Sequence, residues 1–236
     1  MANVFIESYI RHDDGTIEIT DESVHYISNV LRLRAGDYIT LFTYKGEYMG
    51  GEIVSIYKNH AIIAAQSLTP PDTESSLDIT LFQGLLKGEK LELVIQKATE
   101  LGVKKIVPII TERSVPSFTR KIDRLQKIAG QACRQSGRVK IPNISEPVNF
   151  RDSIKRHTGH GIIFYEGAGT RIPSFEPSID KIDIYIGPEG GFSEGEVRLA
   201  ESKGLIVTTL GKRILRAETA AITGVSLIQY LFGDLN

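Results

Sequence analysis

The pattern of hydrophobic and polar positions changes character near residue 70. Before this point, short apolar and β-branched runs alternate with punctuation such as AGD, YKG and YKNH, which is typical of β-strands joined by turns. One segment differs, because Val24, Ile27 and Leu31 share a helical face and Asp21 is placed to cap the first turn. The first part is therefore predicted to be a small β-barrel with one short helix.

A run of Pro, Ser, Thr and acidic residues, SLTPPDTESS at 67–76, separates this part from the rest of the chain. This composition is typical of a linker between domains. We therefore expect a first domain at residues 1–72 and a second domain at residues 73–236.

Strands alternate with helices after the linker. Continuous apolar runs at 104–110, 161–167 and 181–187 are typical of buried parallel strands, and the segments between them contain stretches of helical periodicity. Ser193 and Glu196 form a capping-box pattern at the start of one such helix, and Gly102 is placed to end another. The alternation predicts an α/β fold built on a parallel sheet.

The composition limits the class of protein. Hydrophobic residues make up 41% of the 236 positions, which is enough for an ordinary core. No apolar run approaches the roughly 20 residues of a membrane span, and the first residues do not resemble a signal peptide. Cys133 is the only cysteine, and the five histidines show no metal-ligand spacing. We expect a cytoplasmic protein with no membrane segment and no metal.

The net charge of −1 is unevenly distributed. Residues 1–72 hold 5 basic and 10 acidic residues, a net of −5, whereas residues 73–236 hold 23 and 19, a net of +4. Within 112–140, 8 basic residues face 2 acidic ones, a net of +6. Such a basic stripe can attract a polyanion such as RNA, although a solvated helix face would have the same pattern.

Glycine-rich turns follow three of the predicted strands. They are YEGAG at 165–169, GPEGGF at 187–192 and LGKRILR at 210–216. Ligands of parallel sheets bind at the carboxyl ends of strands, and glycine permits close approach of the backbone. None of the turns matches a dinucleotide or P-loop pattern, and Pro188 removes a backbone donor. The pattern favours a pocket for a neutral or cationic ligand, and it leaves open three turns without any ligand.

Several longer segments resemble one family. IGPEGGFSEGE, LGKRILRAETA, QKATELGV, TERSV and RQSGR are similar to motifs of the RsmE family of SPOUT-class methyltransferases, and HYISNVLRLRAGD resembles the PUA-like barrel of that family. The resemblance covers nearly the whole chain. It implies a C-terminal SPOUT α/β domain with a deep trefoil knot, preceded by an N-terminal PUA-like RNA-binding β-barrel. The implied activity is methylation of the N3 of a uracil in 16S ribosomal RNA.

The same resemblance implies S-adenosylmethionine (SAM) as cofactor, a homodimer, and 16S rRNA or the assembled small ribosomal subunit as partner. The residues that would contact the cofactor lie in the three glycine-rich turns: Gly167, Ile186, Gly187, Glu189, Gly191, Leu210, Gly211, Ile214 and Leu215.

Methylation of N3 requires removal of its proton. Arg216 is expected to stabilise negative charge on the uracil oxygens, and Glu218 or Glu189 is expected to act as the base. Alternatively, Arg216 holds a phosphate, Glu218 caps the last helix, and Glu189 anchors the amino group of the cofactor.

RNA contact is expected from basic residues of both domains: Arg11, Arg32, Arg34, Arg113, Arg120, Arg124, Arg134 and Arg138. Two other functions remain open from the sequence. One is a SPOUT methyltransferase that acts on a ribose 2′-oxygen or on tRNA, and the other is a noncatalytic RNA-binding protein that has kept the fold.

Overall fold

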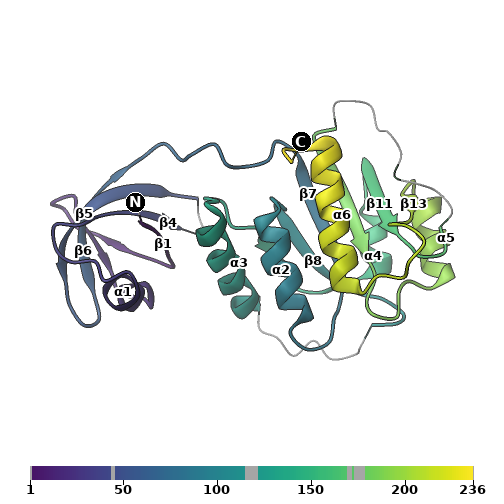
Figure 1. Ribbon diagram of the computed structural model, residues 1–236, viewed down its shortest axis with the longest axis horizontal. Coiled ribbons are helices and arrows are strands. Elements are labelled where there is room, and N and C mark those ends of the chain that lie inside the picture. Colours follow the sequence, from purple (N-terminus) through teal and green to yellow (C-terminus); the bar gives the residue numbers. More distant parts are fainter. Residues whose placement is uncertain (1, 44–45, 115–121, 169–171, 173–178, 236) are drawn as a thin grey trace. The chain divides into compact units, whose positions relative to one another are not determined.

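The computed structural model describes residues 2–43, 46–114, 122–168, 172 and 179–235. The chain divides into two compact units (Figure 1). Unit 1 contains Met1–Glu74 and Cys133–Ile141, and unit 2 contains Ser75–Ala132 and Pro142–Asn236. Unit 1 therefore includes a short segment from the second half of the chain, beyond the linker.

Unit 1 is built on a six-stranded sheet. Its strands are β1 (Ala2–Ile6), β2 (Ile10–Arg11), β3 (Ile17–Ile19), β4 (Tyr38–Thr43), β5 (Tyr48–Ile56) and β6 (Ala61–Ser67). They are ordered β1-β4-β5-β6-β3-β2, with β1 and β4 parallel and the other neighbours antiparallel. The helical segment consists of α1 (Ser23–His25) and a π-helix, η1 (Tyr26–Val30).

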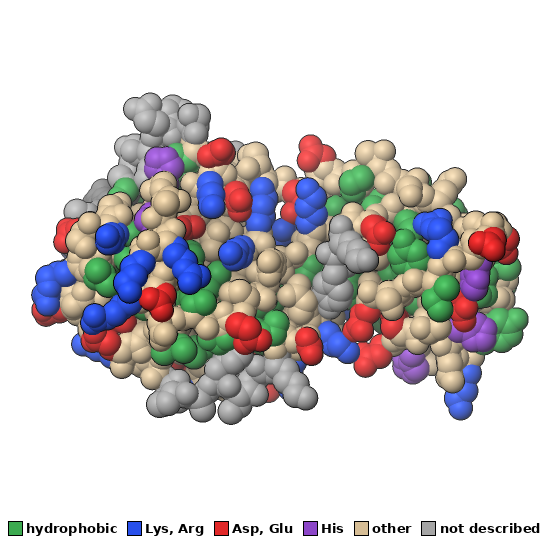
Figure 2. Space-filling view, turned by 180° about the vertical axis from the view of Figure 1, so that it is seen from behind, with side chains coloured by type: hydrophobic (Ala, Val, Ile, Leu, Met, Phe, Trp, Pro, Cys, Tyr) green, Lys and Arg blue, Asp and Glu red, His purple; other side chains and the backbone are tan. Residues whose placement is uncertain are grey.

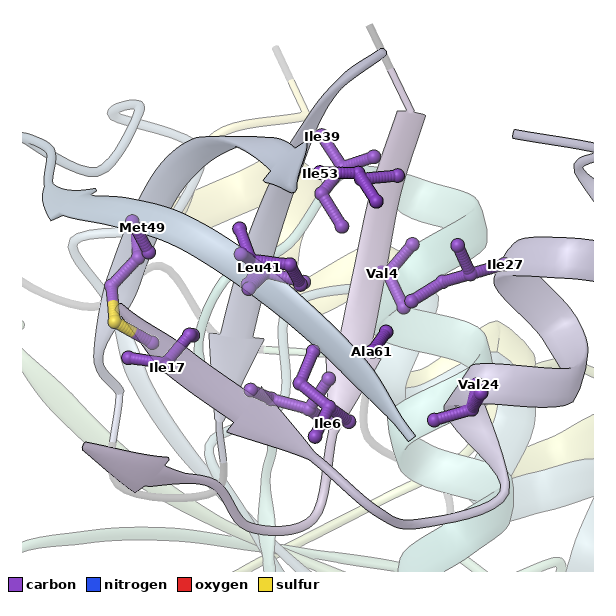
Figure 3. Close-up of a cluster of buried hydrophobic side chains, with 13 residues drawn as sticks. Val4, Ile6, Ile17, Val24, Ile27, Ile39, Leu41, Met49, Ile53 and Ala61 are labelled. Atoms are coloured by element: carbon purple, nitrogen blue, oxygen red, sulfur yellow. The ribbon is translucent and has the colours of Figure 1, made fainter. Parts of the chain in front are cut away.

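Alternate strand residues supply the core of unit 1, because successive side chains point to opposite faces of a sheet. Val4 and Ile6 of β1 are buried, as are Ile17 and Ile19 of β3. Figure 3 shows these strands' side chains converging with those of the helical segment. This burial of apolar surface is the main stabilising contribution to unit 1.

The predicted helical face is confirmed in part. Val24 and Ile27 are buried, and Leu31 packs partly buried against the same core. The helix begins one residue later than expected, so Glu22 occupies the N-cap position. The Asp21 carboxylate instead accepts hydrogen bonds from the Ser23 amide at 2.8 Å and from the Glu7 amide at 2.7 Å. Asp21 thereby ties the helical segment to the chain that follows β1.

Unit 2 contains the expected parallel sheet. Its strands are β7 (Asp78–Gly84), β8 (Lys105–Ile110), β9 (Asn143–Ile144), β10 (Val148–Asn149), β11 (His160–Phe164), β12 (Lys181–Ile186) and β13 (Ile206–Thr208). The order is β10-β8-β7-β12-β11-β13, and β9 also pairs with β8. Every one of these pairs is parallel.

Helices cover both faces of this sheet (Figure 1). They are α2 (Lys90–Glu100), α3 (Ile122–Ser136), α4 (Phe150–Lys155), α5 (Glu194–Ser202) and α6 (Ala217–Phe232). Helix α2 packs beside α6, and α4 packs beside α5 on the other face. Beneath α4 and α5, the fully buried ring of Tyr185 stacks on Phe82 with 4.3 Å between centroids. No helix within the described ranges has the length and apolar character of a membrane span.

Local signals at the helix ends are confirmed. Gly102 follows α2 with φ +83°, a conformation that glycine adopts without a steric penalty. At the start of α5, the Ser193 hydroxyl accepts from the Glu196 amide at 3.2 Å, and the Glu196 carboxylate accepts from the Ser193 amide at 2.9 Å. The capping box thus satisfies two amides that the helix itself cannot pair.

Gln229 connects α6 to two other segments of unit 2, which suggests a test of the packing. Its fully buried side chain accepts from the Ser75 hydroxyl at 2.9 Å and donates to the Leu101 carbonyl at 2.8 Å. We expect Gln229→Leu to lower the free energy of unfolding by about 2–4 kcal/mol, because the Ser75 hydroxyl and the Leu101 carbonyl each lose their hydrogen bond to Gln229.

Urea unfolding followed by circular dichroism measures this change. Thr219→Ala is the matched control, because Thr219 is an exposed residue of the same helix and its replacement should change stability by less than about 0.5 kcal/mol. Equal unfolding midpoints for the Gln229→Leu variant and the native protein would show that the two bonds contribute nothing net.

Candidate functional site

Three loops meet at the carboxyl edge of the unit 2 sheet. Strands β11, β12 and β13 are neighbours, and their last residues stand in register, with Phe164 opposite Ile186 on one side and Thr208 on the other. Because the strands are parallel, the glycine-rich turns that follow them leave from the same edge. The expected convergence of these turns is therefore present, in the place where ligands of α/β sheets bind.

A cavity of about 430 Å³ lies between two of these turns. Its lining consists of Lys90, Phe164, Glu166, Ile186, Gly187, Pro188, Glu189, Gly190, Gly191, Phe192, Ile214, Leu215, Arg216, Ala217 and Ala220. A smaller cavity of about 70 Å³ shares Phe164, Glu166, Ile214, Leu215 and Ala220 with it, and adds Leu210. The shared residues make the two cavities one continuous candidate site.

The structure brings together most of the residues expected to bind the cofactor. Ile186, Gly187, Glu189, Gly191, Ile214 and Leu215 line the larger cavity, and Leu210 lines the smaller one. Gly167 and Gly211 belong to the same turns but line neither of these cavities. These two glycines therefore belong to the turns but do not form part of the cavity wall.

The turn after β12, residues 187–193, closes tightly on itself and is called the cofactor loop below. The Gly191 amide donates to the Pro188 carbonyl at 2.9 Å. A Cβ on Gly187 would lie 3.1 Å from Gly191, and Gly191 has φ +66°. Gly187 is therefore closely packed against Gly191, and Gly191 itself has the left-handed conformation that favours glycine.

Glu189 anchors one side of the cofactor loop. Its Oε1 accepts from the Lys87 amide at 3.1 Å and from the Lys90 ammonium at 3.1 Å. Burial by itself would raise the pKa of Glu189, but hydrogen bonds from its own amide, from Lys87 and from Lys90, together with the charge of Lys90, hold the pKa below its ordinary value. A carboxylate with a lowered pKa is a weaker base, which favours an anchoring role for Glu189.

Arg113 anchors the other side of the loop. Its Nη1 donates to the Gly190 carbonyl at 2.9 Å, and a Cβ on Gly190 would lie 3.0 Å from the Arg113 Cβ. The neighbouring Glu112 amide donates at 2.9 Å to Oε1 of Glu196, which is 3% exposed. The loop after β8 is thus joined to the cofactor loop at Gly190 and to the first turn of α5 at Glu196. Arg113 was expected to contact RNA. In the structure its guanidinium binds the backbone of the cofactor loop.

Glu166 and Phe164 are site residues that the sequence reasoning did not single out. Glu166 lies in the YEGAG turn, and its Oε1 is 3.1 Å from the point where a Cβ on Gly191 would stand. Phe164 is the last residue of β11, and its ring would lie 2.9 Å from a Cβ on Gly224 of α6. The sequence did hold one signal for these two residues. Both lie at or just after the end of a predicted strand, which places them at the carboxyl edge of the sheet.

The expected catalytic residues occupy different places. Arg216 lines the larger cavity as the exposed N-cap residue of α6. Glu218 lies in the first turn of α6 but lines neither cavity, and its buried Oε2 has no hydrogen-bond partner among the described residues. Carboxylates are favoured in the first turn of a helix, because the helix dipole is positive there. The structure therefore brings Arg216 and Glu189, but not Glu218, to the cavity.

Three residues of the basic stripe, Arg134, Arg138 and Lys140, belong to unit 1. Arg138 is 4% exposed, and its Nη2 lies 2.7 Å from the Glu74 carboxylate. This corrects the expectation that Arg138 is part of an exposed stripe, because its charge is buried and paired. Arg134 places its guanidinium over the ring of Tyr26, 4.0 Å from the centroid.

The other expected RNA-binding residues are placed as follows. Arg124 is exposed on α3 and lies 3.0 Å from Glu92, within unit 2. Arg11, Arg32 and Arg34 are exposed on unit 1. Arg120 lies outside the residues that the structure describes. Exposed basic residues are therefore found on each unit.

The larger cavity suits a ligand that is cationic and partly apolar. Phe164, Ile186 and Leu215 give it an apolar wall, and Ile214 is 86% exposed at its side. Glu166 contributes a carboxylate, and the backbone of the cofactor loop contributes polar groups. Its volume lies within the usual range of small-molecule sites, about 300–1,000 Å³. These features fit SAM, whose sulfonium is positive and whose flat adenine ring has apolar faces.

Comparisons with known proteins agree with this geometry. Residues 73–229 match the model of an RNA methyltransferase domain, and residues 19–65 match that of an RNA methyltransferase PUA domain. Ribosomal RNA small subunit methyltransferase E of Rickettsia conorii is 36% identical over 242 residues, covering 97% of this chain and 95% of the relative. The protein of that name from Bacillus subtilis is 35% identical over 231 residues, covering 91% and 90%.

A solved structure gives the same result. The ribosomal RNA small subunit methyltransferase E of Neisseria gonorrhoeae, solved bound to S-adenosyl methionine, is 31% identical. The two chains superpose with a TM-score of 0.90, and the match covers 100% of each. Together with the family models, this confirms the resemblance found in the sequence. The chain belongs to the ribosomal RNA small subunit methyltransferase E family.

Proposed function

We propose that this protein transfers the methyl group of SAM to the N3 of a uracil in 16S ribosomal RNA. The observation that carries the proposal is the cavity between the cofactor loop and the LGKRILR turn, which combines an apolar wall with a carboxylate and close backbone. The relatives' names support the RNA of the small ribosomal subunit as substrate. The N3 position follows from the family that the motifs indicate.

The proposed architecture has two functional domains. Residues 1–72 act as a PUA-like RNA-binding β-barrel, and residues 73–236 act as a SPOUT methyltransferase domain with a deep trefoil knot. The strand order is consistent with this proposal, because β12 lies between β7 and β11 while the following β13 pairs on the far side of β11. A knot of this kind is rare in proteins.

We further propose a cytoplasmic homodimer. Apolar side chains are exposed along the second half of α6, with Leu227, Tyr230 and Leu231 at 36%, 57% and 45% exposure. A contiguous apolar surface of this kind is typical of a contact between protein chains, and a twofold pair is the commonest solution.

The mechanism depends mainly on positioning. When bound, SAM supplies an electrophilic methyl group on a sulfonium. The cofactor loop orients that group through its backbone, while Glu166 and the apolar wall hold the remainder of the ligand. Arg216, at the mouth of the same cavity, is placed to stabilise negative charge on the uracil oxygens as N3 loses its proton.

Glu189 and Glu218 are both kept as proposed bases, and they differ in position. Glu189 lines the cavity and is held as an anion by the Lys87 amide and the Lys90 ammonium, whereas Glu218 lines neither cavity and has one oxygen buried without a partner among the described residues. Exposed Arg11, Arg32, Arg34 and Arg124, together with Arg134, would attract the phosphates of the RNA.

The proposed function is tested on ribosomal RNA from a strain that lacks the gene. Nucleoside mass spectrometry should find 3-methyluridine missing from its 16S rRNA and restored when the gene is returned. The purified protein, incubated with labelled SAM and either naked rRNA or small subunits, identifies which form is the substrate. A methyl group on a ribose oxygen or in tRNA would replace the proposed reaction with a different one.

Arg113 should control cofactor affinity through its bond to the Gly190 carbonyl. We expect Arg113→Gln to raise the Kd for SAM about tenfold or more, because a charge-assisted hydrogen bond that fixes the loop is lost. Isothermal titration calorimetry measures the Kd, and the salt dependence of RNA binding is measured in parallel.

Arg151→Gln is the matched control for this change. Arg151 is exposed and lies 3.6 Å from Glu112 of the same loop, so the variant removes an equal charge without the bond to Gly190. Unchanged SAM affinity in the Arg113 variant, with a shallower salt dependence of RNA binding, would return Arg113 to the group of RNA-binding residues.

Arg216→Lys tests the catalytic assignment. A lysine keeps the charge but cannot present a planar pair of donors, so we expect the single-turnover rate to fall about 10²–10³-fold. SAM and RNA affinities should remain nearly unchanged, because the interaction strengthens only in the transition state. A full rate in this variant, or a loss explained entirely by weaker RNA binding, would make Arg216 a docking residue.

A further inference from the structure

A second cavity, of about 480 Å³, lies away from the candidate cofactor site, toward the opposite edge of the unit 2 sheet. Its floor is formed near the amino ends of β7, β8 and β12, whereas the cofactor site lies at the carboxyl ends of the strands. The chain that follows α4 borders it on the other side, with Arg156 and His157 in the lining. Nothing in the proposed methyl transfer uses these residues.

The strand register gathers polar side chains on one face of the sheet. Thr80 of β7 stands opposite Lys105 of β8 on one side and opposite Asp183 of β12 on the other. Lys181 lies two residues before Asp183 on the same strand, so its side chain points to the same face. All four residues line the cavity. The sheet therefore places Lys105 and Lys181 on the floor of the same cavity.

The acidic residues of this cavity already have partners. Asp183 lies 2.7 Å from Nδ1 of His157, and Asp152 lies 3.4 Å from the ammonium of Lys155. In contrast, Lys105, Arg156 and Lys181 form no ion pair with any residue that the structure describes. The charge left uncompensated in the cavity is therefore positive.

The His157–Asp183 pair is built into the fold. The His157 side chain is 2% exposed, and its imidazole lies against Gly161 of β11, where a Cβ would stand 2.6 Å from the ring. Gly161 is also the residue opposite Asp183 in the β11–β12 register. Glycine at this position makes room for the imidazole ring, and the ring forms a hydrogen bond with one oxygen of the Asp183 carboxylate. This arrangement lessens the repulsion that Asp183 would exert on an anion in the cavity.

We propose that this cavity binds a phosphate group, carried either by RNA or by a free nucleotide. Three cationic residues line a volume large enough for a mononucleotide, and Thr80, Ser145 and Asn149 add neutral donors to the lining. Guanidinium and ammonium groups are the usual partners of phosphate oxygens.

RNA is the favoured source of the phosphate. Figure 2 shows Lys and Arg side chains gathered on the face of unit 2 that lies behind the view of Figure 1, the face covered by α4 and α5. A phosphodiester chain crossing this face would meet several cations in addition to those of the cavity. Only this choice of source rests on the proposed function, because the phosphate site itself does not depend on methyl transfer.

The test compares the full-length protein with a triple variant, Lys105→Gln, Arg156→Gln and Lys181→Gln. The probes are inorganic phosphate, uridine 5′-monophosphate and a short single-stranded RNA. Amide chemical shifts in ¹H–¹⁵N spectra locate the binding, and calorimetry measures each Kd. We expect uridine 5′-monophosphate to shift amides near residues 156–158 and 181–183, and its Kd to rise about tenfold or more in the triple variant.

Matched controls separate this effect from a general loss of charge or of folding. Arg198→Gln with Lys203→Gln removes two exposed cations of the same unit and should leave the Kd values of inorganic phosphate and uridine 5′-monophosphate unchanged. Lys181→Gln alone serves as the second variant, since it changes one exposed side chain. An equal Kd for uridine 5′-monophosphate in the native, triple and single variants, or shifts confined to the cofactor loop, would overturn the proposal.

The RNA arm identifies the source of the phosphate. If RNA supplies it, the slope of log K against log salt should become shallower by about 0.7 for each cation removed. If the slope is unchanged while the nucleotide affinity falls, the ligand is a free nucleotide. Failure of the native protein to methylate rRNA would remove the proposed function and leave the nucleotide result standing, so the two failures are distinguishable.

Discussion

The anchoring of the cofactor loop is the constraint on which the candidate active site depends. The loop contains three glycines within five residues, so in isolation it would have many conformations to lose. Three neighbouring segments restrict it. Gln83 donates to the Gly187 carbonyl at 3.3 Å, Glu189 is tied to the start of α2, and Arg113 donates to the Gly190 carbonyl at 2.9 Å. The wall of the cavity is therefore held before any ligand arrives, which lowers the entropic cost of binding.

Glu196 extends this constraint into the helix that follows. One of its carboxylate oxygens completes the capping box of α5, and the other accepts from the Glu112 amide at 2.9 Å. A buried carboxylate is costly unless it is hydrogen-bonded, and here both oxygens are used. A single side chain thereby fixes the end of the cofactor loop and the loop after β8. A change in either loop would therefore alter the wall of the cavity, because Glu196 bonds directly to both loops.

Features that depend on neighbours in the sequence were predictable, and features that depend on distant contacts were not. The capping box, the glycine after α2 and the alternation of strands with helices were all readable from local patterns. The tether between Arg113 and Gly190 joins residues 77 positions apart, and the pair of Arg138 and Glu74 joins residues 64 apart. A basic residue in a helical pattern gives no sign of whether it faces water or a buried carboxylate. For the same reason, the sequence could not indicate that Cys133–Ile141 groups with unit 1.

The two ends of the unit 2 sheet differ in electrostatic character, and this follows from how their charges are paired. At the carboxyl edge, Lys90 is bound to Glu189, and the carboxylate of Glu166 and the guanidinium of Arg216 both line the cavity. At the amino edge, Asp183 is bound to His157, and Lys105 and Lys181 face the cavity. A sulfonium is therefore favoured at one edge and a phosphate at the other. Because the two ligands differ in sign and the sites are separated by the length of the strands, neither should displace the other. A chain arranged in this way can hold its cofactor and its polyanionic substrate at the same time.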